Sequence, residues 1–317
     1  MSAVIVDQLY KAYGKVQALD GVSFSVKEGE LYGIIGPDGA GKTTLFRILT
    51  TLMLADRGQA QVKGYDVARD YRKIRNIIGY MPGKFSLYQD LTVEENLQFF
   101  ATVFNTTIEE NYHLIADIYR QIEPFKHRMA GKLSGGMKQK LALSCALIHK
   151  PEVLFLDEPT TGVDPVSRKE FWGMLLNLKK QGITILVSTP YMDEATLCDR
   201  IALVQGGAFL EVDTPQGIVA RYPSTLLAVR SGKMHRLLGD LHGYPYVNTS
   251  FSFGTAFHVT LAAEGSPEAL KAYLVQRGHP DVEVQVIPPS VEDCFMLLSH
   301  GTQRHGDTEK DLSFALQ

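Results

Sequence analysis

A glycine-rich loop near the start of the chain constrains the possible folds more than any other feature. The loop GPDGAGKTT, residues 36–44, has the spacing G-x-x-x-x-G-K-[ST]. The apolar run Leu31–Ile35 before it is typical of a buried strand, and Lys42–Thr51 after it carries apolar residues at helical spacing. A strand, this loop and a helix in that order predict a P-loop, which binds the phosphates of a nucleotide. An ordinary glycine-rich turn is the alternative, and the setting disfavours it.

The residue types in the loop each have a chemical reason. Gly39 and Gly41 permit backbone turns that point N–H groups at phosphate oxygens, and the start of the following helix adds its dipole. Lys42 is expected to reach the β and γ phosphates, and the hydroxyl of Thr43 is expected to bind Mg²⁺. The predicted nucleotide-binding residues of the loop are Gly36, Gly39, Ala40, Gly41, Lys42, Thr43 and Thr44.

Two later motifs narrow the chemistry. LSGGMKQK occupies residues 133–140, and VLFLDEP occupies residues 153–159. Asp157 ends an apolar strand, where its carboxylate is expected to hold Mg²⁺ through the water shell of the ion. Glu158 follows and is the candidate that polarises an attacking water. A pair of solvated acids at a strand end is the alternative, which the neighbouring motifs disfavour.

The combination of GPDGAGKTT, LSGGMKQK and LFLDEPTTGVDP resembles the ATP-binding cassette (ABC) ATPases over residues 1 to about 222. The resemblance implies an α/β fold with a RecA-like P-loop NTPase core, an antiparallel β subdomain and a helical subdomain over about residues 84–150. It also implies hydrolysis of ATP with Mg²⁺, in which Lys42 and Glu158 are the catalytic residues.

In that family two cassettes pair head to tail, and the LSGG motif of each caps the γ-phosphate bound by the other. The resemblance assigns this role to Ser134, Gly135 and Gly136, at the start of a helix that favours anions. It places Asp164, in TTGVDP, near the dimer interface. It also assigns Tyr13 to stacking on adenine, with packing of a strand tyrosine on the core as the alternative.

Two positions depart from the family pattern. The family has a glutamine where this chain has Gly83, and a histidine where this chain has Pro190. Neither replacement can form the side-chain hydrogen bond, and losing one preorganised transition-state donor costs about 10²–10³ in rate. We therefore expect near-normal ATP binding and slow hydrolysis at this chain's own site. An intact LSGG beside a weakened site favours an asymmetric pair with a different cassette, although a homodimer stays open.

The pattern of elements suggests two domains and a tail. Short antiparallel strands are predicted in residues 1–30, a strand near residues 76–81, helices over 92–150, a helix between Asp164 and Gly182, and a hairpin around Gly206. Residues 1–222 form the predicted nucleotide-binding domain. Residues 223–300 are predicted to form a small α+β accessory domain of ferredoxin-like topology, and residues 301–317 a flexible tail.

Composition restricts the function further. The net charge of −3 offers no basic field for nucleic acid, and three widely spaced cysteines suit a reduced, cytosolic compartment. The apolar runs are shorter than the roughly 18 residues that span a bilayer. Together with these observations, the resemblance to ABC ATPases of the drug- and polysaccharide-export type implies a cytoplasmic subunit that is held at the cell membrane by a separate integral membrane subunit. The alternatives are an ATP-gated, non-hydrolysing partner of a second cassette, and a soluble ABC protein acting on ribosomes or DNA.

Overall fold

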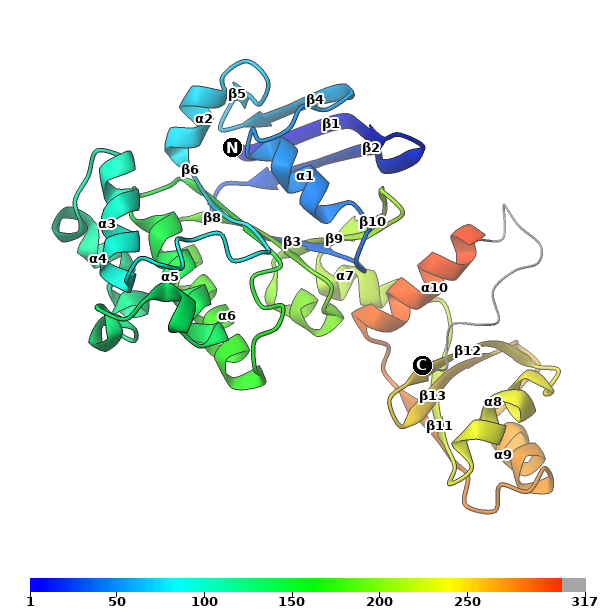
Figure 1. Ribbon diagram of the computed structural model, residues 1–317. Helices are drawn as coiled ribbons and strands as arrows, with labels where there is room; N and C mark the ends of the chain where they lie inside the picture. Colours follow the sequence, from blue (N-terminus) through cyan, green and yellow to red (C-terminus); the bar gives the residue numbers. More distant parts are fainter. Residues whose placement is uncertain (304–317) are drawn as a thin grey trace. The chain divides into compact units, whose positions relative to one another are not determined.

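The structure, a computed structural model, describes residues 1–303 of the 317-residue chain. The chain forms two compact units, which divide between Pro215 and Gln216 (Figure 1). The sequence placed the boundary at 222/223, after the helix α7 (Pro215–Ala220) that begins at this division. The predicted tail lies outside the described residues, apart from 301–303, which complete the last helix.

The central sheet of the first unit has six strands in the order β10-β9-β3-β8-β7-β6. Neighbouring strands are parallel except for the antiparallel pair β9 and β10. Every residue of β3, β7 and β8 is buried, which explains their uninterrupted apolar runs. The strands are β3 (Leu31–Ile35), β6 (Ile78–Met81), β7 (Val153–Asp157), β8 (Thr184–Thr189), β9 (Arg200–Gln205) and β10 (Ala208–Asp213).

A second, antiparallel sheet has the order β2-β1-β4-β5, as the alternation in residues 1–30 predicts. Its strands are β1 (Ser2–Tyr13), β2 (Val16–Lys27), β4 (Arg57–Val62) and β5 (Tyr65–Asp66). The helix α1 (Lys42–Leu49) packs between the two sheets (Figure 1), where Phe46 meets Phe155 edge to face with centroids 5.8 Å apart. One core therefore holds the P-loop helix against both sheets.

The helices of the first unit begin largely where the caps predict. Thr92 and Thr107 form capping boxes with Glu95 and Glu110, and these open α3 (Val93–Val103) and α4 (Ile108–Tyr119). The helices α5 (Gly135–Leu147) and α6 (Pro165–Lys180) follow. The sequence did not predict α2 (Tyr71–Ile77), a helix of seven residues in which only Ile74 is buried.

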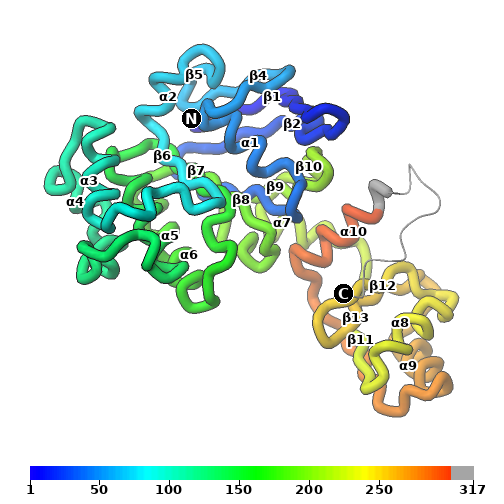
Figure 2. Tube along the Cα trace, in the orientation of Figure 1, coloured from blue at the N-terminus to red at the C-terminus, as the bar shows by residue number. Residues whose placement is uncertain are grey.

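The second unit is an antiparallel sheet with the order β12-β13-β11-β14 and two crossover helices, which confirms the ferredoxin-like topology. Its elements, which Figure 2 traces, are β11 (Leu226–Arg230), α8 (Met234–His242), β12 (Val247–Phe253), β13 (Ala256–Leu261), α9 (Pro267–Gln276), β14 (Glu283–Ile287) and the added helix α10 (Val291–Gln303). Its core lies between the sheet and the helices α8 and α9.

Candidate nucleotide-binding and hydrolytic site

The loop between β3 and α1 has the backbone that phosphate binding requires. Gly39 and Gly41 have φ angles of 78° and 99°, in the left-handed region that side chains with a Cβ rarely enter. A Cβ at Gly36 would lie 2.2 Å from the carbonyl oxygen of Val204, and one at Gly41 equally close to that of Ala18. These glycines therefore serve both the loop conformation and its close packing on neighbouring segments.

The side chain of Lys42 folds back into the P-loop. Its Nζ donates hydrogen bonds to the carbonyl oxygens of Gly36, at 2.8 Å, and Pro37, at 2.9 Å. The same atom forms an ion pair with Glu158 Oε1 at 3.0 Å, and the Lys42 side chain is only 2% exposed. The structure thus brings the two residues predicted to be catalytic into direct contact.

Asp157 and Glu158 stand at the end of β7 and are fixed by β8. Ser188 Oγ donates to Asp157 Oδ1 at 2.6 Å, and the N–H of Glu158 donates to Ser188 Oγ at 3.0 Å. Glu158 has a φ of 50°, an uncommon conformation that directs its side chain toward Lys42. The adjacent Tyr80 hydroxyl has its pKa raised to about 12, chiefly by burial and further by the charge of Asp157. The sequence prediction missed Ser188, which is marked only by its position near the end of β8, directly after the apolar run Ile185–Val187.

The two departures from the family pattern lie at this same edge of the sheet. A Cβ on Gly83 would be 3.1 Å from the carbonyl oxygen of Asp157 and 3.8 Å from the Cβ of Glu158. Pro190 follows Thr189 at the end of β8, next to the strand end that bears Asp157. Gln89 lies beside Gly131 instead: its carbonyl accepts a hydrogen bond from the Gly131 N–H, and its Oε1 would be 3.6 Å from a Cβ at Gly131.

Tyr13 ends β1 and has a 45% exposed side chain, so it is not part of the core. Its hydroxyl donates to Met53 Sδ at 3.0 Å and lies 3.5 Å from Thr44 Oγ1, at the end of the P-loop. The ring is therefore near the loop with a surface open to solvent. Stacking on adenine stays a prediction.

The LSGG segment begins α5, and Ser134 caps this helix by accepting a hydrogen bond from the N–H of Met137. A Cβ on Gly136 would lie 2.7 Å from Ser167 Oγ, so the segment packs closely on the start of α6. Figure 1 shows α5 grouped with α3 and α4, apart from α1 and the P-loop. Within one chain, the LSGG residues Ser134, Gly135 and Gly136 at the start of α5 are therefore not part of the P-loop site that contains Lys42.

Asp164 caps α6 by accepting hydrogen bonds from the N–H groups of Val166 and Ser167, at 3.1 and 3.0 Å. These bonds, led by the one from Ser167, lower the pKa of the Asp164 carboxyl. Asp164 is exposed, and the nearby Val166 is 70% exposed. The loop predicted to face a second cassette is thus on the surface of this chain.

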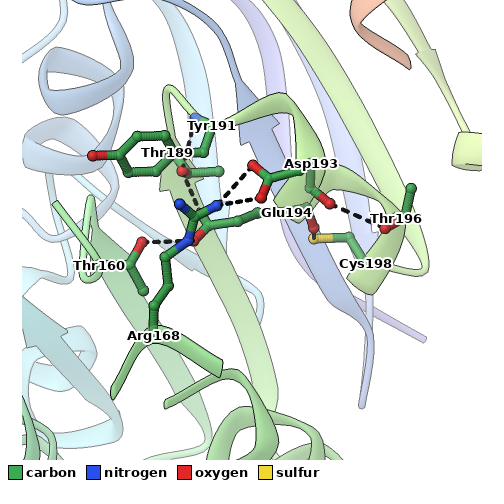
Figure 3. A network of polar contacts seen from close by, with 8 residues as sticks. All are labelled: Thr160, Arg168, Thr189, Tyr191, Asp193, Glu194, Thr196 and Cys198. Carbon is green, nitrogen blue, oxygen red and sulfur yellow. Dashed lines mark hydrogen bonds and ion pairs between the residues drawn. The ribbon is translucent and has the colours of Figure 1, made fainter. Parts of the chain in front are cut away.

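A second polar network lies behind the hydrolytic site. The buried carboxylate of Glu194 accepts hydrogen bonds from Thr160, Arg168 and Thr189, which belong to three different segments (Figure 3). The sequence analysis did not single out Glu194. No local pattern marks it, because its partners are 5, 26 and 34 positions away.

An apolar groove separates the central sheet from the helical subdomain. It has a volume of about 610 Å³. Its lining comes from β6, the segment after Gly83, α3, α5, α2 and the segment directly after α1, and includes Met81, Leu87, Phe100 and Ala146. His149 also lines it, stacks on Phe104 with centroids 3.8 Å apart, and donates from Nε2 to the Ile78 carbonyl at 2.8 Å. Burial lowers the pKa of His149, so the neutral imidazole is favoured.

The residues present fit MgATP. The glycines leave room for phosphate against the backbone, Lys42 supplies a cation, and Thr43 and the buried Asp157 supply the oxygen ligands that Mg²⁺ prefers. Within the part of the chain that the structure describes, no three His, Cys, Asp or Glu side chains gather as a metal site. A magnesium site with few protein ligands, completed by phosphates and water, agrees with that donor set.

Comparison with known proteins decides the family. A profile of the ABC transporter family matches residues 19–161. The Nod factor export ATP-binding protein I of Rhizobium sp. (strain N33) is 34% identical over 306 residues, which cover 94% of this chain and 98% of that protein. The chain belongs to the ABC transporter ATP-binding proteins. The probable multidrug ABC transporter ATP-binding protein YbhF of Escherichia coli (strain K12) is 38% identical over 296 residues, 92% of this chain and 50% of YbhF. The chain thus spans half the length of this relative.

Solved ABC cassettes share the fold. CbiO1 from Clostridium perfringens superposes with a TM-score of 0.62 at 27% identity, over 69% of this chain and 91% of that one. The cassette MJ0796, in a dimeric post-hydrolysis state with ADP and phosphate, has a TM-score of 0.61 at 26% identity, over 67% of this chain and 98% of that one. These comparisons confirm the predicted ABC ATPase and its P-loop NTPase fold. Among residues 1–303, no helix is long and apolar enough to cross a membrane.

Proposed function

We propose that this ABC protein binds MgATP and drives an export-type transporter, with hydrolysis at its own site slowed by Gly83 and Pro190. The observation that carries the proposal is the contact between Lys42 and Glu158 at 3.0 Å, beside Asp157 at the end of β7. This ion pair joins Lys42, which is predicted to bind phosphate, to Glu158, a carboxylate that can accept a proton from water.

The same contact suggests the order of events. In the structure, Lys42 neutralises Glu158 and donates its other two hydrogen bonds to the loop carbonyls of Gly36 and Pro37. The γ-phosphate of ATP competes for Lys42, and this releases the Glu158 carboxylate to accept a proton from the attacking water. Thr43 and Asp157 would hold Mg²⁺, which neutralises charge on the β and γ phosphates when bound.

A complete site requires a second cassette in this proposal. Ser134, Gly135 and Gly136 stand at a helix start that is separate from this chain's own P-loop (Figure 1), where they suit the γ-phosphate of a partner. Tyr13 would stack on adenine, and Asp164 would lie at the cassette interface. The similar cassette MJ0796 is dimeric in its post-hydrolysis state, which supports this arrangement for the present chain.

The membrane subunit is proposed to dock in the apolar groove beside Gly83. Leu87 lines this groove, and Tyr88, the next residue, is 51% exposed. An apolar groove with an exposed aromatic at its edge suits an inserted helix of a partner. The protein would then act on the cytoplasmic face of the membrane, bound through that partner. The names of the relatives, a multidrug transporter and a Nod factor exporter, support export without identifying the transported molecule.

The second candidate is an ATP-gated partner that does not hydrolyse ATP, and Gly83 and Pro190 favour it. Phosphate release by the full chain, compared with Glu158→Gln, tests both proposals. Turnover that is slow but abolished by Glu158→Gln supports the first, and turnover equal in the two proteins supports the second. Failure of MgATP to raise the melting temperature of either protein would refute both, because a ligand that binds the folded state must stabilise it.

A further inference from the structure

We infer that Glu194 is a positioning residue for hydrolysis, which holds the loop from Glu158 to Asp164 through a clasp formed with Thr160, Arg168 and Thr189. This inference rests on the proposed ATPase activity. It goes beyond that proposal by assigning a function to the polar network behind the site, which no P-loop or LSGG residue enters.

The Glu194 carboxylate is buried, and both of its oxygens accept hydrogen bonds. Glu194 is 2% exposed, and its Oε1 accepts from Thr160 Oγ1 at 2.8 Å and from Arg168 Nε at 2.7 Å. Its Oε2 accepts from Thr189 Oγ1 at 2.5 Å. A carboxylate removed from water costs several kcal/mol unless it is paired and hydrogen-bonded, so these three donors determine where Glu194 can lie.

Arg168 is fixed from a second side. Its Nη2 donates to both carboxylate oxygens of Asp193, and its guanidinium lies 4.2 Å from the centroid of the Tyr191 ring (Figure 3). Asp193 and Glu194 together raise the pKa of Arg168 although burial opposes this, so the side chain stays charged. The guanidinium therefore contacts two carboxylates and an aromatic ring at the same time.

The hydrogen bonds of Glu194 connect the two ends of the loop from Glu158 to Asp164. Thr160 is two residues after Glu158, and Arg168 is one helical turn after Asp164, the residue that caps α6. Glu194 joins both, so it restrains the loop at each end. Ser188 restrains Glu158 itself, through the hydrogen bond from the Glu158 N–H.

The same carboxylate reaches the strand end where the family histidine is missing. Thr189 directly precedes Pro190, and its Oγ1 also accepts a hydrogen bond from the N–H of Tyr191. Pro190 offers no side-chain donor there, and Ser188 and Glu194 supply side-chain hydrogen bonds that join this strand end to the catalytic loop. A shift of the loop on nucleotide binding would therefore be transmitted to Arg168 and α6.

The only tryptophan of the sequence reports on this network. Trp172 is one turn beyond Arg168 on α6 and 3% exposed, and it lines a surface pocket together with Arg168, Asp193 and Glu194. Its Nε1 is buried and has no hydrogen-bond partner among the described residues. Its emission should therefore respond to small changes in the polar groups nearby.

The test replaces Thr160 by valine in the full-length protein, which removes one donor to Glu194 at nearly constant volume. Because a displacement of about 1 Å can cost about 10²-fold in rate, we expect kcat to fall by at least about tenfold. The dissociation constant for MgATP should stay within about twofold, because no P-loop contact changes. The emission change of Trp172 on adding MgATP should shrink, and Thr160→Ser, which restores the hydroxyl, should recover both readouts.

Thr196→Val is the matched control. Thr196 lies in the same short helix as Glu194 and its hydroxyl donates to the backbone of Asp193, so its loss leaves the clasp intact. It should leave kcat and the Trp172 response unchanged. If Thr160→Val does not fold, Arg168→Lys, which can pair with Asp193 or Glu194 but not span both as the guanidinium does, should lower kcat in the same way.

Two results would overturn the inference. One is a Thr160→Val protein with unchanged kcat and Trp172 response. The other is a loss of kcat matched by an equal loss of ATP affinity, which Thr160→Ser does not restore. If the wild-type protein binds MgATP but turns it over no faster than Glu158→Gln, the proposed hydrolysis fails instead. In that case the role of the clasp is tested by the Trp172 response to MgATP. Loss of this response in Thr160→Val, but not in Thr196→Val, would support the clasp, and an unchanged response would refute it.

Discussion

The replacement Gly83→Gln should increase hydrolysis by this protein. Gly83 does not have a positive φ, so its backbone accepts any residue. A Cβ there would lie 3.1 Å from the carbonyl oxygen of Asp157 and 3.8 Å from the Cβ of Glu158. The first contact requires a local shift of a few tenths of an ångström. A glutamine amide would then start beside both acidic residues, where Mg²⁺ and the attacking water are expected.

The expected rise in kcat follows from the contribution that one preorganised hydrogen-bond donor makes to transition-state stabilisation. Removing such a donor costs about 10²–10³ in rate, or about 2.7–4 kcal/mol of transition-state stabilisation. The crowding at Asp157 and the remaining defect at Pro190 reduce what a new donor can recover. We therefore expect at least about a tenfold rise in kcat, equivalent to about 1.4 kcal/mol, with ATP affinity changed by less than about twofold.

The assay is steady-state phosphate release by the full chain at saturating MgATP. Gly83→Ala is the matched control, because it adds the same Cβ against Asp157 without the amide, and it should not exceed the wild-type rate. Adding Glu158→Gln to the glutamine variant should abolish the gain. Equal rates for the alanine and glutamine variants would refute the reasoning. So would a wild-type rate typical of complete cassettes that Glu158→Gln abolishes.

Three further predictions follow from other parts of the first unit. Lys42→Met should remove the stabilisation by MgATP, about 2.7 kcal/mol at a hundredfold excess over the dissociation constant, measured as a lost shift in melting temperature. Phe155→Ala should lower the free energy of unfolding by about 3–5 kcal/mol in urea titrations, because this ring is fully buried between the sheet and α1. The lowered pKa of His149 means that its stabilising contribution is complete above its unfolded pKa of about 6.5 and is lost as pH falls through the lower folded value. His149→Gln should therefore reduce the loss of stability between pH 7 and 5, and an unchanged pH dependence would contradict this assignment.

The sequence alone determined the elements whose causes are local. The spacing of GPDGAGKTT requires glycine at positions with left-handed φ, and Gly39 and Gly41 have it. The capping boxes at Thr92 and Thr107, and the apolar runs of β3, β7 and β8, are patterns of neighbouring residues. These causes act within a few positions, so they can be recognised without knowing the fold.

Only the tertiary structure decided which of those elements meet. The close approach of Gly36 to Val204, the bond from Ser188 to Asp157 and the bonds from Thr160 and Arg168 to Glu194 join segments far apart in the chain. No local preference encodes such contacts, because they arise when buried strands align in one sheet and their polar ends must share hydrogen bonds. The sequence thus identified the groups expected to act on ATP, and the packing of β7 against β8 determined how they are held.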